Sequence, residues 1–118
     1  MHESLPVCPQ MLAGWDGRKP HWQREIAAWK LCLIKDFPPP DGWKVSVVTR
    51  CSLKYEHHGE CYMDESAKVV RITIARADWH VMVSTLWHEW AHIVDQTHGD
   101  KFHKRYGQIY RFYIEGTK

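Results

Sequence analysis

The sequence predicts an α+β fold in which a small, three-stranded, mainly antiparallel sheet packs with three helices. Apolar residues recur at helical spacing near both ends of the chain, and three short segments between them alternate apolar and polar residues. A chain of 118 residues has the length of one ordinary domain. We therefore expect a single domain over residues 1–118.

The composition is that of a folded, soluble protein, with 44% hydrophobic and 25% charged residues. A formal net charge of +2 is too small to indicate a dedicated nucleic-acid-binding protein. Residues 1–12 include His2 and Glu3 and no long apolar run, so we expect a cytoplasmic protein without membrane contact. No Cys-x-x-Cys pair occurs, so we expect the four cysteines to be free thiols: Cys8, Cys32, Cys51 and Cys61.

The first helix follows an irregular N-terminal arm, residues 1–19, which contains prolines and glycines but no periodicity. The helix should start at Pro20, because apolar residues then recur four, three and four positions apart at Trp22, Ile26, Trp29 and Leu33. Three consecutive prolines after Phe37 cannot continue a helix and predict a stiff turn.

The three strands are predicted at residues 44–51, 60–64 and 68–76, where apolar and polar residues alternate. In the third, Val70, Ile72 and Ile74 should face the core. Short links join the three segments, with a loop expected over residues 55–59. The sequence thus predicts an antiparallel meander.

Two further helices are predicted after the sheet. Over residues 81–95 an apolar stripe consists of Met82, Leu86, Trp90 and Ile93. The last helix carries an aromatic stripe at Phe102, Tyr106, Ile109, Tyr110 and Tyr113. Its other face is basic and polar, with Lys101, Lys104, Arg105, Gln108 and Arg111.

The second of these three helices carries the motif HExxH, as His88-Glu89-Trp90-Ala91-His92. Two histidines four positions apart on a helix differ by about 40° in direction, so both imidazoles can reach one ion. On the helix the Glu89 side chain points about 100° away from that of His88. We therefore expect its carboxylate to lie beside the metal without being a ligand. The spacing indicates a Zn²⁺ site in which Glu89 is the general base toward a metal-activated water.

A catalytic zinc usually has three protein ligands, and His98 is the favoured third one. On a continuing helix His98 would point about 240° away from His92, so the helix must end near Asp95 or Gln96. Glu115 and His103 are weaker candidates for the same position.

Other polar residues near the motif have possible supporting roles. Asp95 is a candidate acceptor for a ring N–H of a ligand. His103 and Tyr106 are candidate donors to an oxyanion, although Tyr106 is more simply explained as core. We expect the adjacent His57 and His58 to be solvated.

This arrangement resembles the SprT-like and WLM-type minimal metallopeptidases, a zincin family with the pattern HExxH, five residues, then H-G-x-x-F. His98, Gly99 and Phe102 stand at the matching positions, and the resemblance covers about residues 84–106. It implies a minimal zincin-like domain that hydrolyses peptide bonds, with His88, His92 and His98 as zinc ligands and Glu89 as base. We do not expect the C-terminal cysteine ribbon that some members carry, because no cysteine occurs after Cys61 in this sequence. The metzincin pattern has the same spacing but requires Gly where this chain has Asp95.

The expected substrate is a peptide or protein that lies along an exposed strand edge. The third predicted strand is the candidate edge, and its Arg71 and Arg76 are candidates for contact with the substrate. We expect a monomer. The alternative function is a zinc-stabilised nucleic-acid or protein-binding adaptor with a zincin fold and no peptidase activity, which the basic last helix would support. An inactive zincin whose metal is purely structural is a further possibility.

Overall fold

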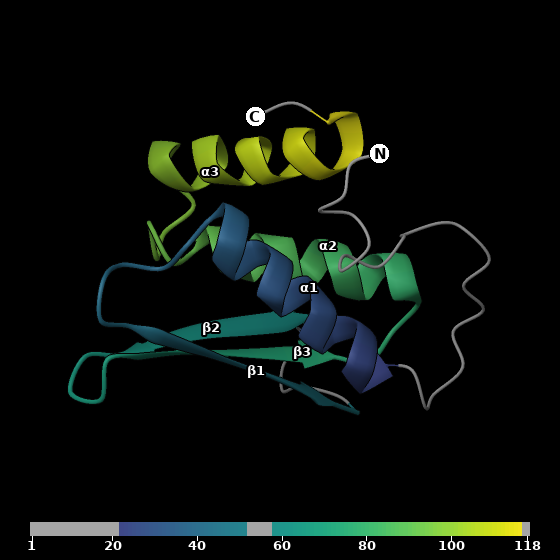
Figure 1. The fold of residues 1–118 in the computed structure, drawn as a ribbon, viewed down its shortest axis with the longest axis horizontal. Helices are drawn as coiled ribbons and strands as arrows, with labels where there is room; N and C mark the ends of the chain where they lie inside the picture. Colours follow the sequence, from purple (N-terminus) through teal and green to yellow (C-terminus); the bar gives the residue numbers. More distant parts are fainter. Residues whose placement is uncertain (1–21, 52–57, 117–118) are drawn as a thin grey trace.

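The computed structural model describes residues 22–51 and 58–116 and contains every predicted helix and strand (Figure 1). In chain order these are α1 (Trp22–Asp36), β1 (Lys44–Arg50), β2 (Gly59–Asp64), β3 (Val69–Ala75), α2 (Trp79–Ala91), α3 (Asp100–Tyr110) and the π-helix η4 (Arg111–Glu115). The α+β class is thereby confirmed. The predicted arm at residues 1–19, together with Pro20, His21 and residues 52–57 of the loop, lies outside the described residues. None of the described helices has the length and apolarity needed to cross a bilayer.

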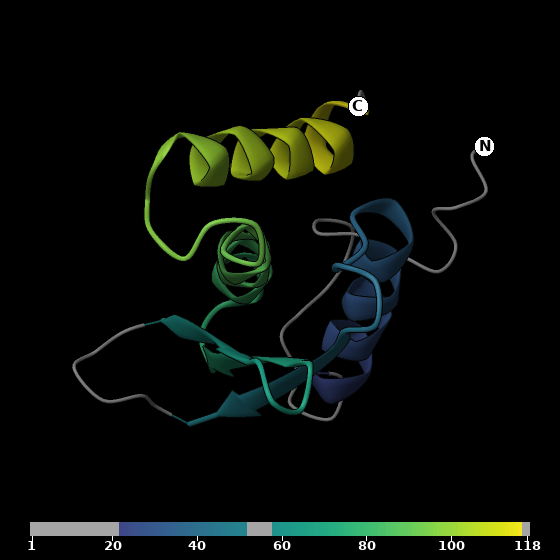
Figure 2. The ribbon, with the colours of Figure 1, turned by 90° about the vertical axis from the view of Figure 1, so that its left-hand side faces the viewer.

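Helix α2 is the central element of the fold. Figure 2 shows it end-on, with the sheet on one side, α3 on the other and α1 alongside. Its buried residues therefore surround the helix instead of forming the single predicted stripe: Trp79, Met82, Val83, Thr85, Leu86, Trp87, Glu89, Trp90 and Ala91. Only a narrow strip of α2 remains open to solvent, and that strip includes His88.

The sheet is mixed, with strand order β1-β3-β2. β3 pairs in parallel with β1 and antiparallel with β2, so the predicted antiparallel meander is wrong. The predicted β2–β3 hairpin is present, but β1 lies on the far side of β3. β3 is the most apolar strand, and its Val70, Ile72 and Ile74 are each 0% exposed. The central position covers such a strand best, because paired strands shield both of its edges.

Helix α1 contributes the other wall of the core. Ile26, Trp29 and Leu33 of the predicted stripe are buried, and the Trp29 ring lies 5.6 Å from that of Trp87. Cys32 is also buried and is disulfide-bonded, so the expectation of free thiols is wrong for this residue. Cys51 and Cys61 are free.

The predicted last helix changes character after Tyr110. The backbone continues as the π-helix η4, a wide form that occurs mostly as single turns. Tyr113 in η4 stacks on Trp87 with ring centroids 5.6 Å apart, and its hydroxyl donates a hydrogen bond to Asp36 Oδ2 at 2.7 Å. The C-terminal element is thus fixed both to α2 and to the end of α1.

The Tyr113 hydroxyl gives a test of this packing. Tyr113→Phe removes one half-buried hydrogen bond and should lower the free energy of unfolding by about 1 kcal/mol in urea denaturation. Tyr110, which is 47% exposed, is the matched control, and Tyr110→Phe should change stability by less than about 0.5 kcal/mol. Equal effects of the two substitutions would contradict the described packing of η4.

Candidate metal centre

Helix α2 ends earlier than the sequence predicts. Its last residue is Ala91, and the four backbone N–H groups from His92 to Asp95 each donate to the carbonyl three residues earlier. These tight turns carry the chain out of the α-helical path just after the motif. A continuing helix would have pointed His98 away from His88 and His92. Because the helix ends here, His98 can lie beside these two residues.

Asp95 holds the reversal together. Its carboxylate accepts hydrogen bonds from the Thr97 hydroxyl at 2.6 Å and the Thr97 backbone N–H at 3.0 Å. It also accepts the backbone N–H of Phe102 at 3.3 Å, which satisfies a free donor in the first turn of α3. These bonds, with those to Thr97 first, lower the pKa of Asp95. The side chain therefore joins the end of α2 to the start of α3.

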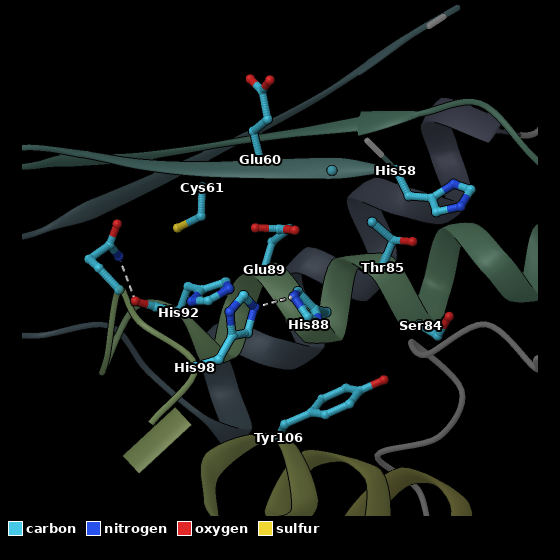
Figure 3. A pocket seen from close by; sticks show the side chains of 12 residues that line it. His58, Glu60, Cys61, Ser84, Thr85, His88, Glu89, His92, His98 and Tyr106 are labelled. Carbon is cyan, nitrogen blue, oxygen red and sulfur yellow. Dashed lines mark hydrogen bonds between the residues drawn. The ribbon is translucent and has the colours of Figure 1, made fainter. Parts of the chain in front are cut away.

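The turn brings three imidazoles together. One ring nitrogen each from His88, His92 and His98 lies within 4.8 Å of the other two, close enough for one metal ion (Figure 3). His88 Nε2 and His98 Nε2 are 3.4 Å apart. His92 Nδ1 lies 3.0 Å from the backbone oxygen of Asp95, which can only accept, so Nδ1 donates and Nε2 keeps its lone pair.

The side chain of Phe102 packs against all three imidazole rings. It is 2% exposed and stacks on His92 with centroids 4.4 Å apart. It also meets His88 and His98, each with ring centroids 4.9 Å away. One buried aromatic ring therefore restricts the orientation of all three imidazoles. The sequence pattern includes this Phe but does not reveal what it contacts.

Glu89 lies beside the imidazoles and is 7% exposed. Figure 3 shows its carboxylate between strand β2 and the rings of His88 and His92. Burial, and then the charge of Glu60, raise the pKa of Glu89 to about 7. Burial also lowers the pKa of His88, and the neighbouring histidines lower it further. Three imidazoles beside a buried carboxylate form a site that favours a cation.

The three histidines and Glu89 line a pocket of about 610 Å³ between β2, α2 and α3. Six further lining residues have no role at the site that the sequence predicts: Gly59, Glu60, Cys61, Ser84, Thr85 and Gln96. His58, expected to be solvated, is exposed but also lines the pocket, whereas His57 lies outside the described residues. The strand order brings the β2 residues here, and no local signal in the sequence encodes it.

Cys61 and Gln96 form the end of the pocket beside His92. Burial raises the pKa of Cys61 to about 12, although a hydrogen bond with Gln96 opposes the increase. The Gln96 side-chain amide also donates to the backbone oxygen of His92 at 2.6 Å. Gln96 thus connects the turn after α2 to strand β2, and Cys61 presents a protonated thiol to the pocket.

The structure separates the remaining predicted candidates. Tyr106 is half-buried and lines the pocket, with its ring centroid 5.7 Å from that of His88. His103 is exposed and contacts the outer side of Phe102, and Glu115 is exposed on η4; neither is among the pocket residues. Neither is placed to complete the imidazole cluster, although His103 is near enough for its charge to help lower the pKa of His88.

The predicted substrate edge is also corrected. β3 is the central strand, and Arg71 pairs with Asp64 at 3.4 Å instead of facing the pocket. Arg76 is exposed beyond the end of β3 and is likewise not a pocket residue. The strand edge that borders the pocket belongs to β2.

Comparisons of the chain with protein-family models, curated proteins and solved structures give no match.

Proposed function

We propose that this chain is a zinc-dependent metallopeptidase with a zincin-like fold and with Glu89 as general base. One observation carries the proposal: three imidazoles meet next to a buried carboxylate in an open pocket. The central position of the HExxH helix, between the small sheet and α3, supports the fold assignment.

The donor set fits zinc. With Zn–N distances near 2.0–2.1 Å, two nitrogens on a tetrahedral ion are about 3.4 Å apart. His88 Nε2 and His98 Nε2 are separated by 3.4 Å. Three neutral imidazoles with a fourth position open toward a pocket are typical of catalytic zinc sites. When bound there, zinc would act as a Lewis acid and lower the pKa of a coordinated water.

The protein's own groups would supply the proton transfers. Glu89 faces the pocket from α2 and would take a proton from the attacking water and later give one to the leaving amine. Tyr106 lines the pocket and would donate a hydrogen bond to the developing oxyanion. Burial raises the pKa of its phenol, so the hydroxyl stays protonated. Its half-buried ring packs against Phe102, so the same residue serves both packing and this role.

Within residues 22–51 and 58–116 no strand pairs with the outer edge of β2, and this free edge suggests how a peptide would lie. The Ala75 N–H donates to His58 O at 2.8 Å, so the pair His58–Ala75 is hydrogen-bonded and the next pair, Gly59–Ile74, is not. By this alternation the N–H and C=O groups of Gly59 and Cys61 point away from β3. An extended peptide could pair with these groups along the pocket.

The adaptor function remains the second candidate. Lys101, Lys104 and Arg111 are exposed on the C-terminal helices, as a phosphate-binding face requires. Arg105 is half-buried, however, and its guanidinium lies 5.4 Å from the centre of the Phe37 ring. The basic face is therefore smaller than the sequence indicates. An adaptor would also keep its binding after Glu89→Gln, whereas the peptidase would lose its activity.

Zinc binding is the first test. Isothermal titration of the metal-free protein should give one Zn²⁺ per chain, and His98→Ala should weaken the affinity by more than about 100-fold because it removes a ligand. His80→Ala is the matched control, because His80 is exposed near the start of the same helix and does not line the pocket, and the affinity of this variant should equal that of the wild type. Unchanged zinc affinity in His98→Ala would exclude the three-histidine site.

Catalysis is tested separately with Glu89→Gln, which keeps the size of the side chain and removes the base. The rate of cleavage of an unfolded protein substrate, followed by mass spectrometry, should fall by about 10²- to 10⁴-fold while one zinc stays bound. Glu115→Gln, on the exposed side of η4, should cleave at the wild-type rate. A zinc-loaded wild type that cleaves no peptide, or a fully active Glu89→Gln variant, would refute the peptidase.

A further inference from the structure

Strand β2 comes unusually close to helix α2 at Gly59. A Cβ atom built on Gly59 would lie 2.6 Å from Thr85 Cγ2, 3.0 Å from Glu89 Cγ and 3.2 Å from Glu89 Oε2. Carbon atoms in van der Waals contact are about 3.5–4.0 Å apart, so even one methyl group has no room here. The backbone of β2 therefore rests directly on the side chain of Glu89.

The neighbours of Gly59 cannot easily move aside. Thr85 and Glu89 are both buried. The β-branched Thr85 has few χ1 rotamers available in a helix, so its methyl group is held against the strand. A side chain at position 59 would have to displace either the strand or the Glu89 carboxylate.

Backbone conformation does not explain the glycine. Among the described glycines, the left-handed region holds Gly42 and Gly116, with φ of 85° and 79°, but not Gly59. Any residue could adopt the backbone angles of an ordinary strand here. The close approach to Glu89 is what requires the missing side chain.

We propose that Gly59 is a positioning residue that fixes the distance between the Glu89 carboxylate and the free edge of β2. The inference rests on the proposed peptidase function and adds a determinant that the HExxH motif does not contain. A peptide paired with the outward N–H and C=O groups of Gly59 would present its backbone beside Glu89. The spacing between β2 and α2 at Gly59 would then set the distance from the Glu89 carboxylate to the bond to be cleaved. A displacement of about 1 Å in such a geometry can reduce a rate by about 100-fold.

The test uses Gly59→Ala alone and together with Thr85→Ser, which deletes the methyl group at 2.6 Å and keeps the hydroxyl. In the zinc-loaded protein, Gly59→Ala should lower kcat by about 10- to 100-fold without loss of zinc, and the double variant should recover part of that loss. Gly107→Ala is the matched control, because its added methyl meets only the end of the Arg111 side chain, and its kcat should be unchanged. A wild-type kcat in Gly59→Ala would overturn the inference.

A second readout does not depend on activity. The ¹³C resonance of the Glu89 carboxyl, assigned by its loss in Glu89→Gln, should shift in Gly59→Ala and return toward the wild-type position in the double variant. If the wild type cleaves no peptide, the proposed function fails, and this resonance alone decides the role of Gly59. An unshifted Glu89 resonance in Gly59→Ala would overturn the inference. So would unfolding of both Gly59→Ala and the double variant, because Gly59 would then be needed only for the fold.

Discussion

The reversal of the chain after Ala91 is the constraint on which the site and the C-terminal packing depend. The HExxH motif supplies two imidazoles from one helix, but a third can join them only if that helix stops and the chain turns back. The Asp95 carboxylate makes this possible by binding Thr97 and the first turn of α3 together. The same turn places Phe102 beneath the three rings and directs α3 across α2. The imidazole cluster and the helix packing therefore depend on one local structure.

The fold shows where sequence reasoning succeeds and where it stops. Helical periodicity and alternation locate the helices and strands, because each pattern reports the faces of one segment. The order of the strands in the sheet depends on which segments pair with each other. The alternation of apolar and polar residues within a strand carries no information about its partners. Chain order predicts β1 beside β2, whereas the apolar β3 takes the middle position.

The site divides in a similar way. Residues on and just after the motif helix were named from the sequence because their spacing follows helical geometry and a single turn. His58, Gly59 and Cys61 were not, since they reach the pocket only through the arrangement of the sheet. The role of Asp95 was anticipated only in part: its backbone oxygen contacts His92, while its carboxylate organises the turn. The end of α2 was also misplaced, because the tight turns from His92 to Asp95 have no glycine or proline to announce them.

The three imidazoles differ in how deeply they lie. His92 is buried and bonded through Nδ1, His88 is half-buried, and His98 is exposed at the end of the turn. A ligand on a surface turn can swing away through local opening, which requires far less free energy than global unfolding. Exchange of a bound ion with the surroundings would thus begin at His98 and leave the core intact. If the imidazole cluster binds zinc as proposed, the rate at which the ion enters or leaves would be a property of the Asp95 turn, separate from the stability of the fold.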